Sequence, residues 1–368
     1  MALIGLTKKQ TYLLFQSNLK STMAKKLTYA KAGVDIFKHK KAIGAIEEEL
    51  KFSRRGIGKP LKIKHHFAGL IDFGKYALAL CTDGVGTKIL VAQALKKYDT
   101  LGIDCIAMNV NDCICVGAEP LAFVDYIALQ KPNQKLVAEL GKGLNKGAEI
   151  ANISIIGGET AIVPELVRSF DLAGTCLGYV RKKDIISGES IKPGDIIIGL
   201  KSSGIHSNGL TLARKVLEKN RIKYTDKFPG SNKTWGEILL EPTEIYVQPI
   251  ISLFKLKLPL HGLAHITGSG IRKISRLNRN VKFVLEDLFQ PQKIFQMLQE
   301  LGNIDIEEMH QTFNMGMGFS MIVDEKYEAE ILQLLKSKSN KRIADAKVIG
   351  RVEAGKGIII PKLGINYP

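Results

Sequence analysis

The stretch YALALCTDGVGTK, residues 76–88, runs from an apolar segment straight into a loop with two glycines. This order predicts a β-strand whose carboxyl end carries a loop, which is where α/β proteins place their ligands. Gly84 and Gly86 would let backbone N–H groups approach phosphate oxygens. Lys88 would supply a cation, and Asp83 is a hard oxygen ligand suited to Mg²⁺. A plain β-turn explains the loop about equally well, and the residue order of a Walker loop is absent.

On either side of this stretch, short apolar runs alternate with helical patterns. Before residue 182, the predicted strands cover 76–82, 121–130, 153–156 and 171–180, and the predicted helices cover 102–116 and 135–151. After residue 195, the predicted strands cover 196–200, 281–285, 319–323, 347–352 and 356–360, and the predicted helices cover 210–219, 243–255, 291–301 and 326–335. Such alternation indicates α/β layers, and the turn-rich segment 182–195 separates two of them. We therefore predict an α/β fold with some α+β character and two domains, 29–185 and 186–368, after an N-terminal extension, 1–28, that is expected to be poorly ordered.

The charge of the chain is a possible sign of a nucleic-acid partner. The 368 residues carry 53 Lys+Arg against 36 Asp+Glu, a formal net charge of +17. Residues 1–60 alone hold 13 basic and four acidic residues, and 42 of the 53 cations are lysine rather than arginine, whose fork suits bases and phosphates. We therefore expect a solvated lysine-rich surface and no nucleic-acid partner. No run approaches the roughly 20 apolar residues that span a bilayer, so no membrane segment is expected.

The cysteines form no CxxC pair and no zinc spacing; they are Cys81, Cys105, Cys113, Cys115 and Cys176. An odd number in a long chain without a secretory signal indicates reduced thiols and a cytoplasmic location. Cys113 and Cys115 lie in an apolar stretch and are expected to fill the core.

Two further carboxylates are candidates for a metal site. Asp112 lies in an otherwise apolar predicted helix and shares a face with Asn109, three residues earlier. A buried hydrogen bond explains that pair as well as a metal ligand does. Glu159, in GGET (157–160), follows a predicted strand and could join Asp83 and Asp112 around Mg²⁺. The alternative is a helix start capped by Thr160.

Three loops rich in small polar residues complete the candidate site. SSGIHSNG (202–209) lies between a predicted strand and a predicted helix, whose N-terminus is suited to phosphate. HITGSG (265–270) opens a predicted helix in the same way, although His265 could equally be structural. FNMGMG (313–318) precedes a strand, and Asn314 in it could orient a polar ligand. The nucleophile elbow G-x-S-x-G is absent. The loops and acids together predict an enzyme that uses Mg²⁺ and ATP on a phosphorylated small molecule.

Nine motifs, in this order, resemble the phosphoribosylformylglycinamidine cyclo-ligase family of de novo purine biosynthesis. They are YAKAGVDI (29–36), DGVGTK (83–88), MNVNDCICVGAEP (108–120), GGETA (157–161), DLAG (171–174), SSGIHSNG (202–209), EPTEIYV (241–247), HITGSG (265–270) and FNMGMG (313–318). The resemblance runs from about residue 29 to near the C-terminus.

The resemblance implies a homodimer whose N-terminal domains pair their sheets, with each C-terminal domain closing a substrate cleft. It also implies that ATP activates the amide oxygen of formylglycinamidine ribonucleotide and that an amidine nitrogen then closes the imidazole ring. The implied products are aminoimidazole ribonucleotide, ADP and phosphate.

The resemblance further implies roles for single residues. Those expected to contact ATP are Lys31, Asp35, Asp83, Gly84, Gly86, Thr87, Lys88, Asp112 and Glu159, of which Asp83, Asp112 and Glu159 would hold Mg²⁺. Those expected to contact the substrate are Ser203, Gly204, His206, Ser207, Asn208, Thr267, Gly268 and Asn314. The catalytic candidates are Lys88, His206 and His265, and which histidine transfers a proton stays open.

The chain departs from the family pattern at Lys31, and two other functions have to be compared with the cyclo-ligase reaction. The family usually has its lysine one position earlier than Lys31, which leaves a nucleotide contact by Lys31 open. A thiamine-monophosphate kinase of the same superfamily would also use Mg²⁺ and ATP, but SSGIHSNG and HITGSG match the cyclo-ligases better. A basic nucleic-acid-binding protein would explain the charge but not the glycine loops.

Overall fold

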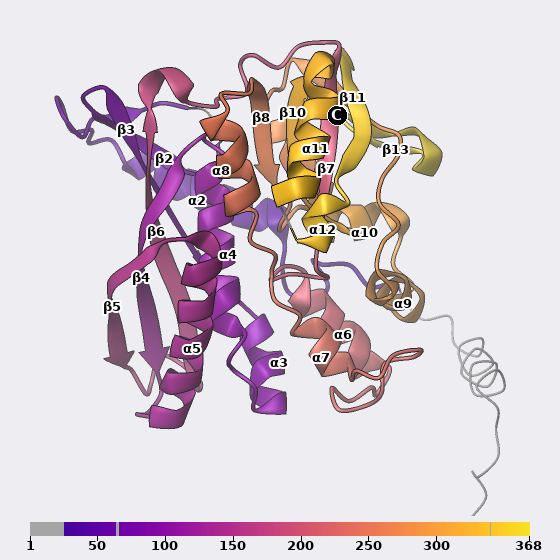
Figure 1. Cartoon of the computed structure of the whole chain (residues 1–368). Coiled ribbons are helices and arrows are strands. Elements are labelled where there is room, and N and C mark those ends of the chain that lie inside the picture. Colours follow the sequence, from indigo (N-terminus) through magenta and orange to yellow (C-terminus); the bar gives the residue numbers. More distant parts are fainter. Residues whose placement is uncertain (1–25, 64–65, 339) are drawn as a thin grey trace, which may run out of the picture.

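The computed structural model describes residues 26–63, 66–338 and 340–368. Two β-sheets, each with helices packed on it, lie side by side (Figure 1). The first sheet is built from strands between Pro60 and Arg181, and the second from strands between Asp195 and Tyr367. The predicted α/β fold with two domains is therefore confirmed. Of the predicted extension, residues 1–25 lie outside the described ones.

The first sheet has six strands in the order β1-β2-β3-β6-β4-β5. Their bounds are β1 Pro60–Leu61, β2 Gly69–Phe73, β3 Tyr76–Gly84, β6 Phe170–Arg181, β4 Glu119–Leu129 and β5 Ser154–Ile162. β6 is antiparallel to both β3 and β4, and β5 is parallel to β4. The carboxyl ends of β3, β4 and β5 therefore lie at the same edge of the sheet.

Helices α4 (Leu101–Ile114) and α5 (Gln134–Ala151) pack against one face of this sheet (Figure 1). Glycines let the two helices touch, because a Cβ on Gly102 would lie 2.1 Å from Leu144 N. α5 begins where the Asn133 side chain accepts a hydrogen bond from Leu136 N, an ordinary N-cap. α4 is buried along almost its whole length, which is why its sequence is apolar on nearly every side.

The other face of the first sheet carries exposed apolar side chains. Leu80, Leu121, Val124 and Tyr126 are 44%, 44%, 38% and 46% exposed. Alternation along the strands directs Leu80 and Tyr126 away from α4, because their neighbours Ala79 and Ile127 are buried. We call this surface the open face; its apolar side chains stay exposed among the residues that the structure describes.

The second sheet has seven strands in the order β13-β12-β9-β11-β7-β10-β8. Their bounds are β13 Ile365–Tyr367, β12 Gly357–Ile360, β9 Val281–Leu285, β11 Lys347–Ala354, β7 Asp195–Lys201, β10 Met317–Asp324 and β8 Leu260–His265. The remaining α-helices are α2 Ile36–Glu49, α3 Lys88–Leu95, α6 Leu210–Lys219, α7 Trp235–Leu239, α8 Val247–Lys255, α9 Lys293–Gly302, α10 Ile306–Thr312, α11 Glu328–Lys338 and α12 Lys341–Ala344. Short 3₁₀ helices are η1 Lys182–Asp184, η2 Gly270–Arg276, η3 Glu325–Tyr327 and η4 Pro361–Leu363.

The two halves share one hydrophobic core. Its cluster joins residues of α4, such as Ile106, to residues of β7, such as Leu200. α8 contacts α4, α5 and β4, so a helix of the second half packs on the first. Among the described residues, no helix combines the length and the apolar character that a membrane crossing requires.

Three sequence predictions about elements need correction. GGET was predicted as a loop after a strand, or a helix start capped by Thr160, but β5 continues through it to Ile162. Glycines in an edge strand resemble a turn in sequence. HITGSG opens the 3₁₀ helix η2 rather than an α-helix. β8 was not predicted at all.

Candidate active site

The loop after β3 has the backbone of a ligand-binding turn. Val85 is buried, and its N–H donates to Leu172 O at 3.0 Å, which attaches the loop to β6. Gly86 has φ +65°, and a Cβ on it would meet nothing within 4 Å. The loop leads directly into α3, where Ile89 N and Leu90 N donate back to Gly86 O and Thr87 O at 3.2 Å. Open space therefore lies beside a helix N-terminus, as an anion site requires.

Two aspartates lie beside this loop. Asp83 is at the end of β3 and Asp112 is on α4. Desolvation and the charge of Asp112 together raise the pKa of Asp83. Lys273, on η2, lies near both carboxylates, and its pKa is lowered by burial while the charge of Asp112 opposes that shift. Two mutually repelling carboxylates are an arrangement that a divalent cation stabilises.

A histidine holds Asp112 in place. His265 is fully buried, and its Nδ1 lies 2.8 Å from Asp112 Oδ1. Its Nε2 lies 3.4 Å from Asn111 Nδ2. Asn111 Oδ1 accepts from Tyr246 N at 2.9 Å, so the amide group of Asn111 faces the histidine. His265 Nε2 is thus an acceptor, and His265 carries its proton on Nδ1 and donates it to Asp112.

His206 has a different environment. It is fully buried with φ +61°, the left-handed region. Its Nε2 accepts from Ser203 N at 3.1 Å and lies 3.4 Å from Glu244 N. Those contacts hold the turn of the 202–209 loop in one conformation.

Lys88 does not lie where its sequence position suggested. It is fully buried, with Nζ 2.8 Å from Asp104 Oδ1 and 2.7 Å from Glu241 O. Burial lowers the pKa of Lys88, and Asp104 opposes that shift. The prediction that this ammonium faces the nucleotide phosphates therefore needs correction, because the ammonium bonds to groups inside the protein.

Asp104 joins several segments through one oxygen. Besides Lys88, its Oδ1 accepts from Thr243 N at 2.8 Å and Thr243 Oγ1 at 2.6 Å, and from Ser207 Oγ at 3.1 Å. These bonds connect α3 and α4 to the 202–209 loop and to residue 243. We call Asp104, Lys88, Ser207 and Thr243 the Asp104 cluster.

The polar loops of the second half meet one another. A Cβ on Gly268 would lie 3.0 Å from Asn208 Oδ1, which brings HITGSG against SSGIHSNG. Asn314 Nδ2 donates to Gly204 O at 2.8 Å, and Asn314 Oδ1 accepts from Ser202 Oγ at 3.0 Å. Thr267 is buried at the same junction and its carbonyl accepts from Gly270 N. The predicted substrate residues therefore form one connected group.

Three predicted site residues of the same chain lie apart from this group: Glu159, Lys31 and Asp35. Glu159 is on β5, three strands from β3 and so roughly 14 Å away at the usual strand spacing. It is paired in register with Tyr126, so it belongs to the open face, opposite Asp83. A single chain therefore does not bring Glu159 to the two aspartates.

The other two lie in the N-terminal segment. Lys31 is exposed, and its Nζ donates to Lys26 O at 2.9 Å. Asp35 Oδ1 accepts from Lys38 N at the start of α2. The segment itself packs on the second half, since Tyr29 N donates to Glu308 Oε1 at 2.6 Å.

Sequence reasoning missed Asp104, Lys273 and Asn111. Asp104 had a signal, because a carboxylate in an apolar helix needs a partner. The side-chain partners of Asn111 are residues 244, 246 and 265, which no local pattern reveals.

Sequence profiles of known families match both halves. The N-terminal domain of AIR synthase related proteins matches residues 65–180, and the C-terminal domain of the same proteins matches residues 192–361. Phosphoribosylformylglycinamidine cyclo-ligase of Methanosarcina acetivorans is 50% identical over 325 residues, which cover 88% of this chain and 97% of that protein. The chain belongs to the phosphoribosylformylglycinamidine cyclo-ligase family. The member from Methanocaldococcus jannaschii is 47% identical over 93% of this chain and 97% of its own length.

Solved structures share the fold of this family at lower identity. A HypE–HypF complex has a TM-score of 0.62 with 17% identity, covering 88% of this chain and 97% of that one. AaThiL complexed with AMPPCP and TMP has a TM-score of 0.61 with 16% identity, covering 90% of this chain and 96% of that one. These likenesses concern the fold alone.

Proposed function

We propose that this chain is an ATP-dependent ligase that closes formylglycinamidine ribonucleotide to aminoimidazole ribonucleotide, with release of ADP and phosphate, in purine biosynthesis. The observation that carries the proposal is the 50% identity to a cyclo-ligase over 88% of the chain. The convergence of the DGVGTK loop, Asp83 and Asp112 supports it, because an ATP-using reaction needs an anion loop beside metal-binding carboxylates.

The reaction would proceed in two steps, and the site residues would orient the reacting groups in each. The γ-phosphoryl group passes from ATP to the amide oxygen of the substrate, which leaves ADP and turns a poor leaving group into phosphate. The amidine nitrogen then attacks the same carbon, phosphate leaves, and a proton is lost to give the aromatic imidazole. Because the attacking nitrogen belongs to the same molecule, holding the substrate in the reactive conformation supplies much of the acceleration.

Mg²⁺ fits the two aspartates. Asp83 and Asp112 are oxygen ligands of the kind that Mg²⁺ prefers. Burial and then the charge of Asp112 raise the pKa of Asp83, and a cation would offset both effects. When bound, Mg²⁺ would neutralise charge on the phosphates. Gly86 and Thr87 would offer backbone N–H groups to the same phosphates, whereas Gly84 N donates to Asp83 Oδ1 at 2.7 Å. We do not propose Glu159 as a third ligand, because it lies three strands away from Asp83 in the same chain.

Lys88 and the two histidines would act in different ways. Lys88 would position the site through Asp104 rather than contact phosphate itself. His265 would orient Asp112 through the 2.8 Å bond. His206 would shape the substrate loop through Ser203, and it stays the candidate for proton transfer beside the substrate.

The substrate would lie where the polar loops meet. Ser203, Gly204, Ser207 and Asn208 belong to the loop before α6, whose N-terminal N–H groups suit the ribose phosphate. Thr267, Gly268 and Asn314 form the other side. Lys31 and Asp35 stay candidates for closing the nucleotide side.

We further propose a cytoplasmic homodimer in which the open faces of two first sheets pack together. An exposed apolar surface of this kind is unusual on a monomer and typical of an interface. The open face includes Leu80 and Tyr126, and Glu159 belongs to it.

The proposed reaction is tested by incubating the purified protein with formylglycinamidine ribonucleotide, Mg²⁺ and ATP. We expect aminoimidazole ribonucleotide and ADP to form in equal amounts. A parallel incubation with thiamine monophosphate tests the kinase alternative, and a folded sample that phosphorylates only that compound would contradict our proposal. Tight duplex DNA binding that weakens steeply with salt would instead support the nucleic-acid alternative.

A further inference from the structure

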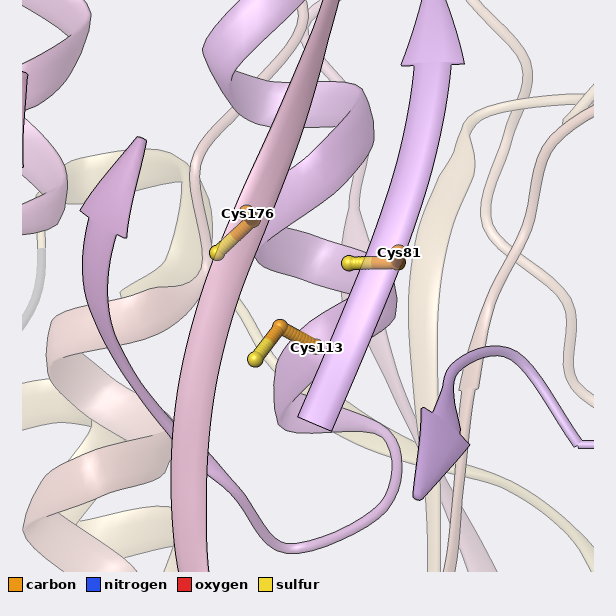
Figure 2. A group of neighbouring side chains, drawn as sticks. All are labelled: Cys81, Cys113 and Cys176. Carbon is orange, nitrogen blue, oxygen red and sulfur yellow. The ribbon is translucent and has the colours of Figure 1, made fainter. Parts of the chain in front are cut away.

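Three thiols converge inside the first half, away from the loops described above. Cys81 comes from β3, Cys113 from α4 and Cys176 from β6 (Figure 2). Their sulfur atoms all lie within 4.8 Å of one another. Cys113 and Cys176 are buried, and Cys81 is partly buried. We call these residues the thiol cluster.

The fold itself brings the cluster together. Cys81 and Cys176 are direct partners in the β3–β6 register, so both side chains point to the same face of the sheet. That face is the one on which α4 packs, and α4 brings Cys113 beneath them. Gly178, also on β6, makes room for it, because a Cβ there would lie 2.4 Å from Cys113 Sγ.

We propose that Cys81, Cys113 and Cys176 form a three-sulfur binding site for a soft metal ion, with Cu(I) as the ion that fits best. Thiolates select Cu(I), zinc and iron–sulfur centres over hard cations. With metal–sulfur bonds of about 2.3 Å, three ligands around one ion stand roughly 4 Å apart. The sulfurs already lie within 4.8 Å of one another. Each would have to move by only a few tenths of an ångström, through a small side-chain rotation, to bind one ion.

The number of ligands favours Cu(I) over zinc. Zinc sites in proteins are almost always four-coordinate, whereas Cu(I) accepts three sulfurs. In the part of the chain that the structure describes, no histidine or carboxylate joins the cluster at the same spacing. Binding replaces thiol protons, which leave to the solvent, and no oxidation is involved.

A bound ion would also affect the ATP turnover of the chain, an expectation that rests on the proposed function. Cys81 lies two residues before Asp83, and Cys113 directly follows Asp112. Cys81 Sγ also donates to Asn109 O at 3.0 Å, and Asn109 Nδ2 donates to Asp83 O. An ion that draws the sulfurs together would therefore move the backbone that carries both proposed magnesium ligands, and we expect it to lower ATP turnover.

Copper binding itself is measured without any assay of activity. The full-length protein, reduced and free of metal, is titrated anaerobically with Cu(I) against bicinchoninate, a chelator that changes colour when it holds the ion. We expect each protein chain to bind one Cu(I) ion that bicinchoninate then cannot take up. Serine substitution of Cys81, Cys113 or Cys176 is expected to weaken binding by at least about 100-fold, more than the loss of a supporting residue around a metal causes.

Cys105→Ser is the matched control, because Cys105 is also buried on α4 but lies outside the cluster. It should bind Cu(I) like the unchanged protein. X-ray absorption at the copper edge of the unchanged protein should show three sulfur neighbours, a result that needs no variant to fold. No withheld copper, a spectrum without three sulfurs, or serine variants that all bind Cu(I) as tightly as the unchanged protein would overturn the proposal, whatever the protein does with ATP.

Discussion

At the scale of single residues, Asp83 carries most of the proposed chemistry. Its carboxylate is desolvated by burial and repelled by Asp112, so its pKa is raised and the folded protein holds the Asp83 proton more tightly than an unfolded chain does. Asp83 therefore contributes stability below the usual aspartate pKa of about 3.9, and loses that contribution as the pH rises through its raised pKa. At neutral pH the carboxylate is an unfavourable charge that a bound cation would compensate.

Asp83→Asn should reduce ATP turnover on the order of 100-fold or more, the usual loss when a charge-stabilising group is removed. The thermal midpoint of the metal-free variant should equal or exceed that of the original protein, because the repulsion with Asp112 is gone. An assay of ADP release measures the turnover, and differential scanning calorimetry of the metal-free proteins measures the thermal midpoint. Unchanged turnover would remove Asp83 from the metal role.

The raised pKa also predicts how metal binding depends on pH. Mg²⁺ needs the ionised carboxylate, so its affinity should decline as the pH falls, starting above the range in which an ordinary aspartate takes up its proton. Titration calorimetry with Mg²⁺ and a non-hydrolysable ATP analogue between pH 5 and pH 8, roughly, covers the range in which such shifts appear. An affinity that is flat throughout would contradict the assignment.

At the scale of secondary-structure elements, the Asp104 cluster joins α3, α4, the 202–209 loop and residue 243. The Lys88–Asp104 pair is fully buried, so removing one partner leaves an uncompensated charge. Asp104→Asn should therefore lower the free energy of unfolding by about 3–5 kcal/mol. The double variant Lys88→Met with Asp104→Leu should lose less, because both charges are gone.

Urea denaturation measures these free energies of unfolding. The control is Asp184→Asn, which breaks the exposed Arg181–Asp184 pair and should cost no more than about 1 kcal/mol. If Asp104→Asn costs as little as this control, the Asp104 cluster does not hold the elements together.

Elements also show what the sequence could and could not predict. Long apolar runs such as residues 171–180 correctly predicted strands, because burial on a sheet selects β-branched and apolar residues. β8, with the sequence LHGLAH, was missed because its glycine and histidines interrupt the apolar pattern. The burial of Lys88 could not be foreseen either, since one of its contacts, Glu241 O, lies 153 residues away. The motifs that indicate Asp83 and Asp112 as metal ligands are local in the sequence, and that role stays a prediction.

At the scale of the whole molecule, the open face predicts a dimer. Leu80→Lys places a charge in the middle of the proposed interface and should produce a monomer in sedimentation velocity experiments. Leu363→Lys is the control, because Leu363 is similarly exposed, at 40% against 44%, but lies on η4 in the second half. A monomeric unchanged protein, or a dimeric Leu80→Lys variant, would contradict the prediction.

The most direct test of the account follows one oxygen atom. Formylglycinamidine ribonucleotide labelled with ¹⁸O in its amide oxygen is converted with Mg²⁺ and ATP, and the released phosphate is analysed by mass spectrometry. If ATP activates that oxygen, the phosphate should carry one ¹⁸O for each aminoimidazole ribonucleotide formed. Unlabelled phosphate, with the ¹⁸O released as water, would contradict the proposed mechanism.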